Sequence, residues 1–233
     1  FLAWTTTPWT LPSNVALCVH PDHDYVQVRA GEYTYYLAEA LVPTVLGEDV
    51  EILRRMKGKD LEYRAYEPLF HFVTPKEKAW YVTCDDYVTL TDGTGIVHIA
   101  PAFGEDDANV GRKYGLPLVQ LVDAKGCMTQ ETDWPGVFCK EADQQILVAL
   151  DQRGLLFSAP KFEHSYPHCW RCDTPLIYYA RESWFIRMTA VKEQLIANNN
   201  QIHWMPESIG KGRFGDWLEN IQDWGISRDR YWG

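Results

Sequence analysis

The sequence predicts an α+β protein with a β-barrel-like core and peripheral helices. Short runs of β-branched and aromatic residues recur about every ten residues and are separated by turn residues, as in antiparallel barrels. Helical patterns are fewer and lie mainly in the second half of the chain. No glycine-rich loop of the P-loop or dinucleotide-binding type is present. These observations favour a closed or nearly closed barrel over a doubly wound parallel sheet.

The predicted strands are bounded by turn pairs such as Pro21-Asp22 and Gly31-Glu32, which favour a meander with tight turns. They cover residues 15–20, 25–30, 33–38, 50–55, 80–84, 95–100 and 116–122. The predicted helices follow the apolar spacing of three and four residues that is typical of an amphipathic helix. They cover residues 105–114, 140–153 with Gly154 as a stop signal, 189–198 and 213–224.

Composition and charge divide the chain into two parts. The 233 residues carry a formal net charge of −10, and 46% of them are hydrophobic, which is enough to bury a full core. Residues 1–107 carry a net charge of −9, residues 108–160 carry −1, and residues 161–233 are neutral. The last part also holds six of the ten tryptophans. We therefore expect a barrel domain at 1–160 and a distinct C-terminal part at 161–233.

Several features exclude whole classes of protein. No apolar run reaches the roughly 18–20 residues of a membrane span, so no membrane contact is expected. The acidic balance argues against a generic nucleic-acid binder, because phosphate contacts normally need an excess of lysine and arginine. The cysteine pattern predicts no disulfides and a cytoplasmic location. The two ends resemble neither a natural start nor a natural stop, so we expect a piece of a longer chain that is monomeric by itself.

The first candidate functional segment is residues 5–14, which read TTTPWTLPSN. Thr5, Thr6, Thr7 and Thr10 supply hydroxyls, and Asn14 supplies a carboxamide. Such neutral donors and acceptors suit a ribose, an adenine edge or a carbonyl. The structural alternative is a threonine-rich edge strand that leads into a turn, because the two prolines exclude a central strand.

The second segment is residues 93–107, which read GTGIVHIAPAFGEDD. An alternating strand ends at Ala-Pro, turns at Gly104 and opens a helix with an acidic first turn. His98 and Asp107 flank this turn, so both can face one pocket, where a carboxylate is the natural partner of an ammonium group. The structural alternatives are a buried, satisfied imidazole for His98 and capping of the helix N-terminus for the acidic residues.

The third segment contains Cys169 and Cys172, which have the C-x-x-C spacing of a zinc knuckle. His164 and His168 lie nearby in the sequence and are candidates to complete a site. A strong zinc prediction needs a second cysteine pair, and none follows at ribbon spacing. The residues alone therefore leave a zinc site at this segment open.

Taken together, the first two segments closely resemble the editing domain of isoleucyl-tRNA synthetase, a large insertion in the catalytic fold of this class I family. The resemblance continues through residues 164–172, 183–185 and 223–233, so it covers essentially the whole chain. Leucyl and valyl relatives typically carry Thr-Thr-Arg-Pro at the first motif. Here Thr7 occupies the third position and Trp9 follows the proline, which favours the isoleucyl branch.

The resemblance implies a hydrolase that removes valine from the 3′ end of mischarged tRNA(Ile). A synthetic site rejects valine poorly because one missing methylene is worth only about 1–3 kcal/mol, a limit for which this family is the usual example. A second pocket, too small for isoleucine, then hydrolyses the valine ester. The resemblance also implies that the rest of the synthetase holds most of the tRNA and that editing needs no cofactor. It implies further that Cys169 and Cys172 are half of a zinc site, which a second cysteine pair upstream of the insertion completes in the parent enzyme.

The family's residue roles can be transferred onto matching positions. The resemblance implies that Asp107 grips the α-ammonium of the misattached amino acid, and that Thr5, Thr6 and Thr7 line the pocket and contact the terminal adenosine and the ester. It places His98 at the back of the sieve. The remaining positions shape the pocket or support binding: Trp9, Thr10, Asn14, Ala100, Phe103 and Gly104. The expected mechanism is attack of a positioned water on the ester carbonyl, assisted by the free ribose hydroxyl, without a catalytic triad or metal.

Two other functions remain open from the sequence. One is a non-catalytic module that docks the tRNA 3′ end, and the other is a structural zinc domain. The His-x-Gly-His and Lys-Met-Ser-Lys-Ser signatures of adenylate formation are absent from the chain. We therefore expect no aminoacylation by this chain alone.

Overall fold

The computed structural model describes residues 1–161 and 166–227, and the chain divides into two compact units, Phe1–Ala180 and Arg181–Gly233. The boundary lies further along the chain than the compositional break near residue 160. The reason is that Ile177, Tyr179 and Ala180 pack on the core of the first unit. In addition, the Ala180 N–H donates to the carbonyl of Ala102 at 2.8 Å.

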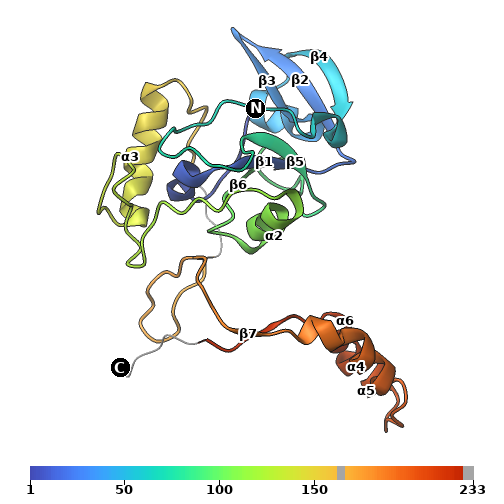
Figure 1. The fold of residues 1–233 in the computed structure, drawn as a ribbon. Coiled ribbons are helices and arrows are strands. Elements are labelled where there is room, and N and C mark those ends of the chain that lie inside the picture. Colours follow the sequence, from blue (N-terminus) through green and yellow to red (C-terminus); the bar gives the residue numbers. More distant parts are fainter. Residues whose placement is uncertain (162–165, 228–233) are drawn as a thin grey trace. The chain divides into compact units, whose positions relative to one another are not determined.

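The first unit is built on two three-stranded sheets (Figure 1). In one sheet, β1 (Ala16–Val19) lies between β5 (Tyr81–Cys84), which is parallel to it, and β6 (Ile96–Ile99), which is antiparallel. In the other sheet, β2 (Asp24–Ala30) lies between β3 (Tyr33–Ala38) and β4 (Glu51–Lys57), antiparallel to both. Each of these strands overlaps a predicted run, so the strand predictions in these regions are confirmed.

The strands do not close into the barrel expected from the sequence. In the described residues the two sheets are separate ladders, joined by single backbone bonds such as Ala38 N to Thr94 O at 2.9 Å. The backbone leaves strand geometry just before β6, because Gly93 and Gly95 have φ values of 74° and 73°. The α+β class is confirmed, whereas a closed barrel is not found.

Tyr25 provides a second link between the sheets. Its side chain starts from β2 and is completely buried. Its hydroxyl donates to the carbonyl of Gly95 at 2.6 Å and accepts from the N–H of His20 at 3.0 Å. His20 directly follows β1 and Gly95 directly precedes β6, both in the other sheet. One phenol therefore satisfies two backbone polar groups that the interrupted ladder leaves open.

The two helices predicted in the first unit, over residues 105–114 and 140–153, are confirmed. Helix α2 (Glu105–Tyr114) follows β6 and ends at Gly115 in the left-handed conformation. Helix α3 (Cys139–Gln152) buries a stripe of apolar side chains at three- and four-residue spacing. That stripe packs against the 3₁₀ helix η1 (Pro8–Ser13), which lies beside α3 in Figure 1. Shorter helices connect the strands: η2 (Glu39–Leu41), α1 (Val42–Leu46) and η3 (Gly58–Leu61).

The predicted strand over residues 116–122 is wrong. Pro117 has no N–H to donate, and the N–H of Leu121 donates to the hydroxyl of Ser13 at 3.2 Å rather than to a neighbouring strand. Val119 and Leu121 are nevertheless buried, packed with Val15. The segment therefore has the alternating burial of a strand, but only an isolated bridge between Val122 and Met128 instead of a ladder. A sequence pattern cannot distinguish the two.

The second unit contains three short helices, α4 (Lys192–Asn199), α5 (Ser208–Lys211) and α6 (Arg213–Glu219). The buried amide of Asn199 donates to the carbonyl of Gly210 at 2.9 Å and accepts from the indole of Trp204 at 3.0 Å. The remaining elements are η4 (Met188–Val191) and the paired strands β7 (Phe185–Ile186) and β8 (Trp224–Gly225). The helix predicted over 189–198 is confirmed, whereas the one predicted over 213–224 ends at Glu219.

Among the described residues, none of the helices has both the length and the apolar character that crossing a membrane would require.

The Tyr25 link leads to a stability prediction. Tyr25→Phe should lower the free energy of unfolding by about 1–3 kcal/mol, because the buried carbonyl of Gly95 and the N–H of His20 lose their partner. Urea unfolding followed by circular dichroism measures this change. The matched control is Tyr33→Phe, in which the altered ring is 63% exposed. Equal stability of the two variants would contradict a linking role for the Tyr25 hydroxyl.

Candidate active site

The threonine segment forms a chain of hydroxyl contacts that leads into η1. The backbone N–H of Thr7 donates to the hydroxyl of Thr5 at 3.0 Å, and the two hydroxyls lie 3.3 Å apart. The Thr7 hydroxyl lies 3.4 Å from that of Thr10, which is buried. Thr5 and Thr7 are half-buried and Thr6 is exposed. The structural alternative of an edge strand is not found here, because the two prolines direct residues 8–13 into a 3₁₀ helix.

Thr10 connects this segment to His98 on β6. Its hydroxyl oxygen lies 2.9 Å from Nε2 of the imidazole. The hydroxyl has one hydrogen, which it donates to the carbonyl of Thr7 at 2.8 Å, so Nε2 is the donor in the pair. His98 is therefore the Nε2–H tautomer, and its Nδ1 is a buried acceptor with no partner among the described residues. Burial lowers the pKa of His98 to about 4, which keeps the ring neutral at neutral pH.

Asp107 lies in the first turn of α2, and its carboxylate folds back toward the preceding loop. One carboxylate oxygen accepts the N–H of Ala100 at 2.7 Å. Burial raises the pKa of Asp107 from 3.8 to about 6, although the hydrogen bond from Ala100 opposes this shift. Within residues 1–161 and 166–227, no ion pair involves this carboxylate. Asp107 is therefore a largely desolvated carboxylate to which the described part of the fold supplies no cation.

Gly104 makes room for that carboxylate. A Cβ at this position would lie 2.2 Å from Oδ2 of Asp107, so the carboxylate would have to leave its present position. Gly104 has an extended backbone, so the requirement is for space rather than for a left-handed conformation. The sequence assigned Gly104 to the pocket, and its contact with Asp107 gives a specific reason for a glycine there.

The apolar part of the predicted pocket comes together in one cluster. Trp9, Ala100 and Phe103 are buried in the same core, and the rings of Trp9 and Phe103 meet edge to face with centroids 5.0 Å apart. Asn14 is buried and its amide is fully engaged. It donates to the carbonyls of Ala16 and Ile99, and it accepts the hydroxyl of Tyr66 at 2.5 Å. Asn14 thus ties the end of η1 to the central sheet.

The cysteine pair occupies a tight turn in which the N–H of Cys169 donates to the carbonyl of Thr174 at 2.9 Å. The thiol of Cys172 is exposed and lies 3.1 Å from the Thr174 hydroxyl. His164 lies outside the described residues. In the part of the chain that the structure describes, no group of three or more His, Cys, Asp or Glu side chains is arranged to hold a metal. Two thiols do not complete a four-ligand zinc site, so no chemical step is assigned to a metal.

Asp143 on α3 was missed by the sequence analysis. Its carboxylate accepts the N–H of Trp9 at 2.8 Å, across 134 residues of sequence. A signal was present, because Asp143 interrupts the apolar stripe formed by Cys139, Ala142, Ile146 and Leu150. An acidic residue inside such a stripe needs a polar partner from another element. Tyr66, which binds Asn14, offered no comparable signal.

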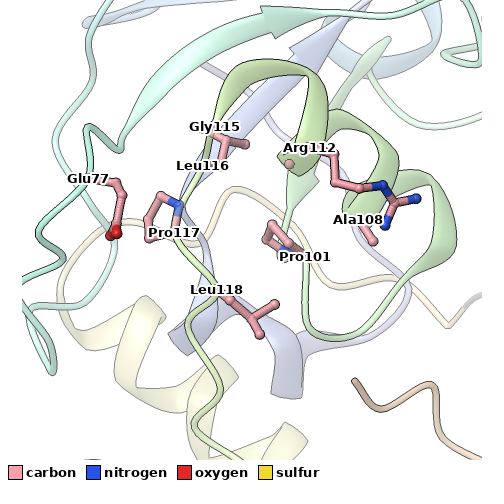
Figure 2. Close-up of a pocket in the computed structure, with 9 residues that line it drawn as sticks. Glu77, Pro101, Ala108, Arg112, Gly115, Leu116, Pro117 and Leu118 are labelled. Atoms are coloured by element: carbon pink, nitrogen blue, oxygen red, sulfur yellow. The ribbon is translucent and has the colours of Figure 1, made fainter. Parts of the chain in front are cut away.

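A hollow of about 370 Å³ lies elsewhere on the first unit, beside α2 (Figure 2). Its walls are mostly apolar, and its two charged members, Glu77 and Arg112, lie on opposite sides in this view. None of the site residues predicted from the sequence lines it. It also lacks convergent polar groups, so the candidate site is the arrangement of threonines, His98 and Asp107.

Known proteins that match this chain support the resemblance that the motifs indicate. Residues 20–233 match the family of tRNA synthetases class I (I, L, M and V). Isoleucine–tRNA ligase of Clostridium acetobutylicum is 56% identical over 233 residues, which is 100% of this chain and 22% of that protein. Isoleucine–tRNA ligase of Thermus thermophilus is 50% identical over 232 residues, with the same coverage of 100% and 22%. The chain thus spans 22% of the length of these relatives.

Solved structures show the same fold at low sequence identity. The crystal structure of GlLeuRS-CP1 matches with a TM-score of 0.54 and 16% identity, over 68% of this chain and 84% of that chain. The editing domain of P. knowlesi cytosolic leucyl-tRNA synthetase matches with a TM-score of 0.50 and 14% identity, over 76% and 83% of the two chains. The motif-based resemblance is therefore confirmed, and the chain belongs to the class I tRNA synthetases of the isoleucine, leucine, methionine and valine group.

Proposed function

We propose that this chain is an editing domain that hydrolyses the ester of valyl-tRNA(Ile). The observation that carries the proposal is Asp107, a largely desolvated carboxylate for which the described fold supplies no cation. An aminoacyl ester carries an α-ammonium group, which would complete the missing ion pair. Family membership and the match to an editing domain of known structure support this choice of ligand.

The hydroxyl chain supports binding of the ester and the ribose. Thr5 already accepts a hydrogen bond from the Thr7 N–H, so its own hydroxyl hydrogen is available to a ligand oxygen when Thr7 donates toward Thr10. The buried rings of Trp9 and Phe103 would bound the side-chain pocket, together with neutral His98. The proposed pocket would exclude isoleucine by size and admit valine.

The proposed reaction is a direct hydrolysis. A water oxygen attacks the ester carbonyl, the bond to the terminal ribose oxygen breaks, and that oxygen takes a proton, which releases valine and tRNA. His98 is an inefficient general base at neutral pH, because its pKa of about 4 is far below the working pH. We therefore assign catalysis to orientation of the water and ester, with the free ribose hydroxyl assisting.

The first test is the selectivity of deacylation and its dependence on Asp107. The chain should deacylate valyl-tRNA(Ile) and spare isoleucyl-tRNA(Ile). Asp107→Ala should lower kcat/KM roughly tenfold to a hundredfold, since a charge-assisted hydrogen bond contributes about 1.5–3 kcal/mol. Release of labelled valine measures both. The matched control is Asp106→Ala, which removes an exposed carboxylate from the same turn and should retain activity.

Two outcomes would contradict the assignment. If Asp107→Ala and wild type deacylate valyl-tRNA(Ile) with equal kcat/KM, Asp107 does not hold the ammonium group. If wild type binds the mischarged tRNA without releasing valine, a docking module replaces the hydrolase.

The pKa of Asp107 gives a separate prediction on stability. Ionising this carboxyl costs more in the folded state than in the unfolded state, so the cost is present above about pH 6 and vanishes as pH falls below the unfolded value of 3.8. Asp107→Asn keeps an oxygen for the Ala100 N–H and removes the charge. This variant should therefore unfold at a higher temperature than wild type at pH 7.5, and at the same temperature near pH 4. Thermal unfolding at both values measures the difference; a higher wild-type melting temperature at pH 7.5 would show that the fold stabilises the charge.

A further inference from the structure

Asp143 reaches from α3 to the beginning of η1, where the threonine segment enters its helix. The N–H of Trp9 donates to its carboxylate at 2.8 Å. Trp9 is the second residue of η1, and Thr7, which precedes the helix, makes no side-chain capping bond. Pro8 has no N–H. The Trp9 N–H is therefore an early donor of the helix that needs an outside acceptor, and Asp143 provides it.

The residues on either side of this contact belong to the candidate site. The ring of Trp9 packs edge to face on Phe103, and the next residue, Thr10, contacts His98 at 2.9 Å. The Thr10 hydroxyl also donates a hydrogen bond to the carbonyl of Thr7. A displacement at the Trp9 backbone would thus move both the sieve ring and the hydroxyl chain.

Placing the charged Asp143 carboxylate at this position costs folding free energy. Asp143 is half-buried, and burial raises its pKa, although the hydrogen bond from Trp9 and the charge of Lys140 oppose the shift. Over the described ranges, no ion pair within 4 Å compensates it. The neighbours of Asp143 on the same stripe, Ala142 and Ile146, are buried and apolar. An apolar side chain would suit this position for packing alone.

We propose that Asp143 is a positioning residue that holds the threonine segment in its active geometry through the Trp9 backbone. This inference rests on the proposed hydrolysis and adds a residue from a third part of the chain to that site. Asp143 touches no reacting atom, so we expect its loss to change kcat more than KM. A misplacement of about 1 Å can reduce a rate roughly a hundredfold.

The test compares four variants in deacylation of valyl-tRNA(Ile). Asp143→Ala should lower kcat about tenfold or more while KM changes less. Asp143→Asn should restore most of the rate, because its amide oxygen accepts the same hydrogen bond. Asp151→Ala removes an exposed carboxylate from the same helix and should match wild type. Ile146→Val loosens the same cluster by about 0.5–1.5 kcal/mol, so it separates lost stability from lost positioning.

A second readout does not depend on catalysis. Amide hydrogen exchange of Trp9, followed by nuclear magnetic resonance, should accelerate in Asp143→Ala and stay slow in Asp143→Asn and Ile146→Val. An Asp143→Ala variant with the kcat of Asp151→Ala would overturn the proposal, as would an Asn variant as slow as the Ala variant. If wild type releases no valine, the hydrolase proposal fails. In that case, unchanged Trp9 exchange in Asp143→Ala would independently overturn the positioning contact.

Discussion

Strand β1 is the constraint on which the first unit depends. All four of its side chains are buried, and both of its edges are paired, with β5 on one side and β6 on the other. A strand in this situation has one register, because a shift by one residue would exchange the buried faces and break both ladders. That register sets His98 opposite Leu17. It also fixes where the preceding η1 helix ends, so Thr10 meets an imidazole from 88 residues further along the chain.

The same scaffold lets the unit keep polar groups that do not serve stability. Asp107 is held by one backbone N–H and given space by Gly104, yet burial makes its charge unfavourable. His98 retains a buried ring nitrogen without a partner in the described structure. Groups of this kind persist where the surrounding packing over-determines them, and they cluster at functional sites. A ligand cation would offset the free-energy cost of the buried Asp107 charge. Binding of such a ligand would therefore stabilise the fold around Asp107.

The acidic charge of the chain is compatible with a tRNA substrate of the proposed kind. Residues 1–107 carry a net charge of −9 and include Asp107 itself. The proposed ligand is one adenosine and its ester, contacted through hydroxyls, backbone groups and a single carboxylate rather than through phosphates. Long-range repulsion between this surface and the remaining tRNA should make binding by the chain weak and sensitive to salt. Most of the phosphate contacts would then come from residues outside these 233.

By itself, the sequence determined the α+β class, six strands of the first unit, helices α2 and α3, and the two segments that form the candidate site. Alternation, helical spacing and turn residues are local, so they are readable without a structure. Tertiary structure decided what depends on distant partners. It replaced the strand expected at 116–122 with a segment that has only an isolated bridge at Val122, and it linked the two sheets through Tyr25 instead of a closed ladder. It also set the tautomer of His98 through Thr10 and brought Asp143 to Trp9. Each of these features depends on a hydrogen bond between groups that lie tens of residues apart in the sequence. No local pattern encodes such a pair.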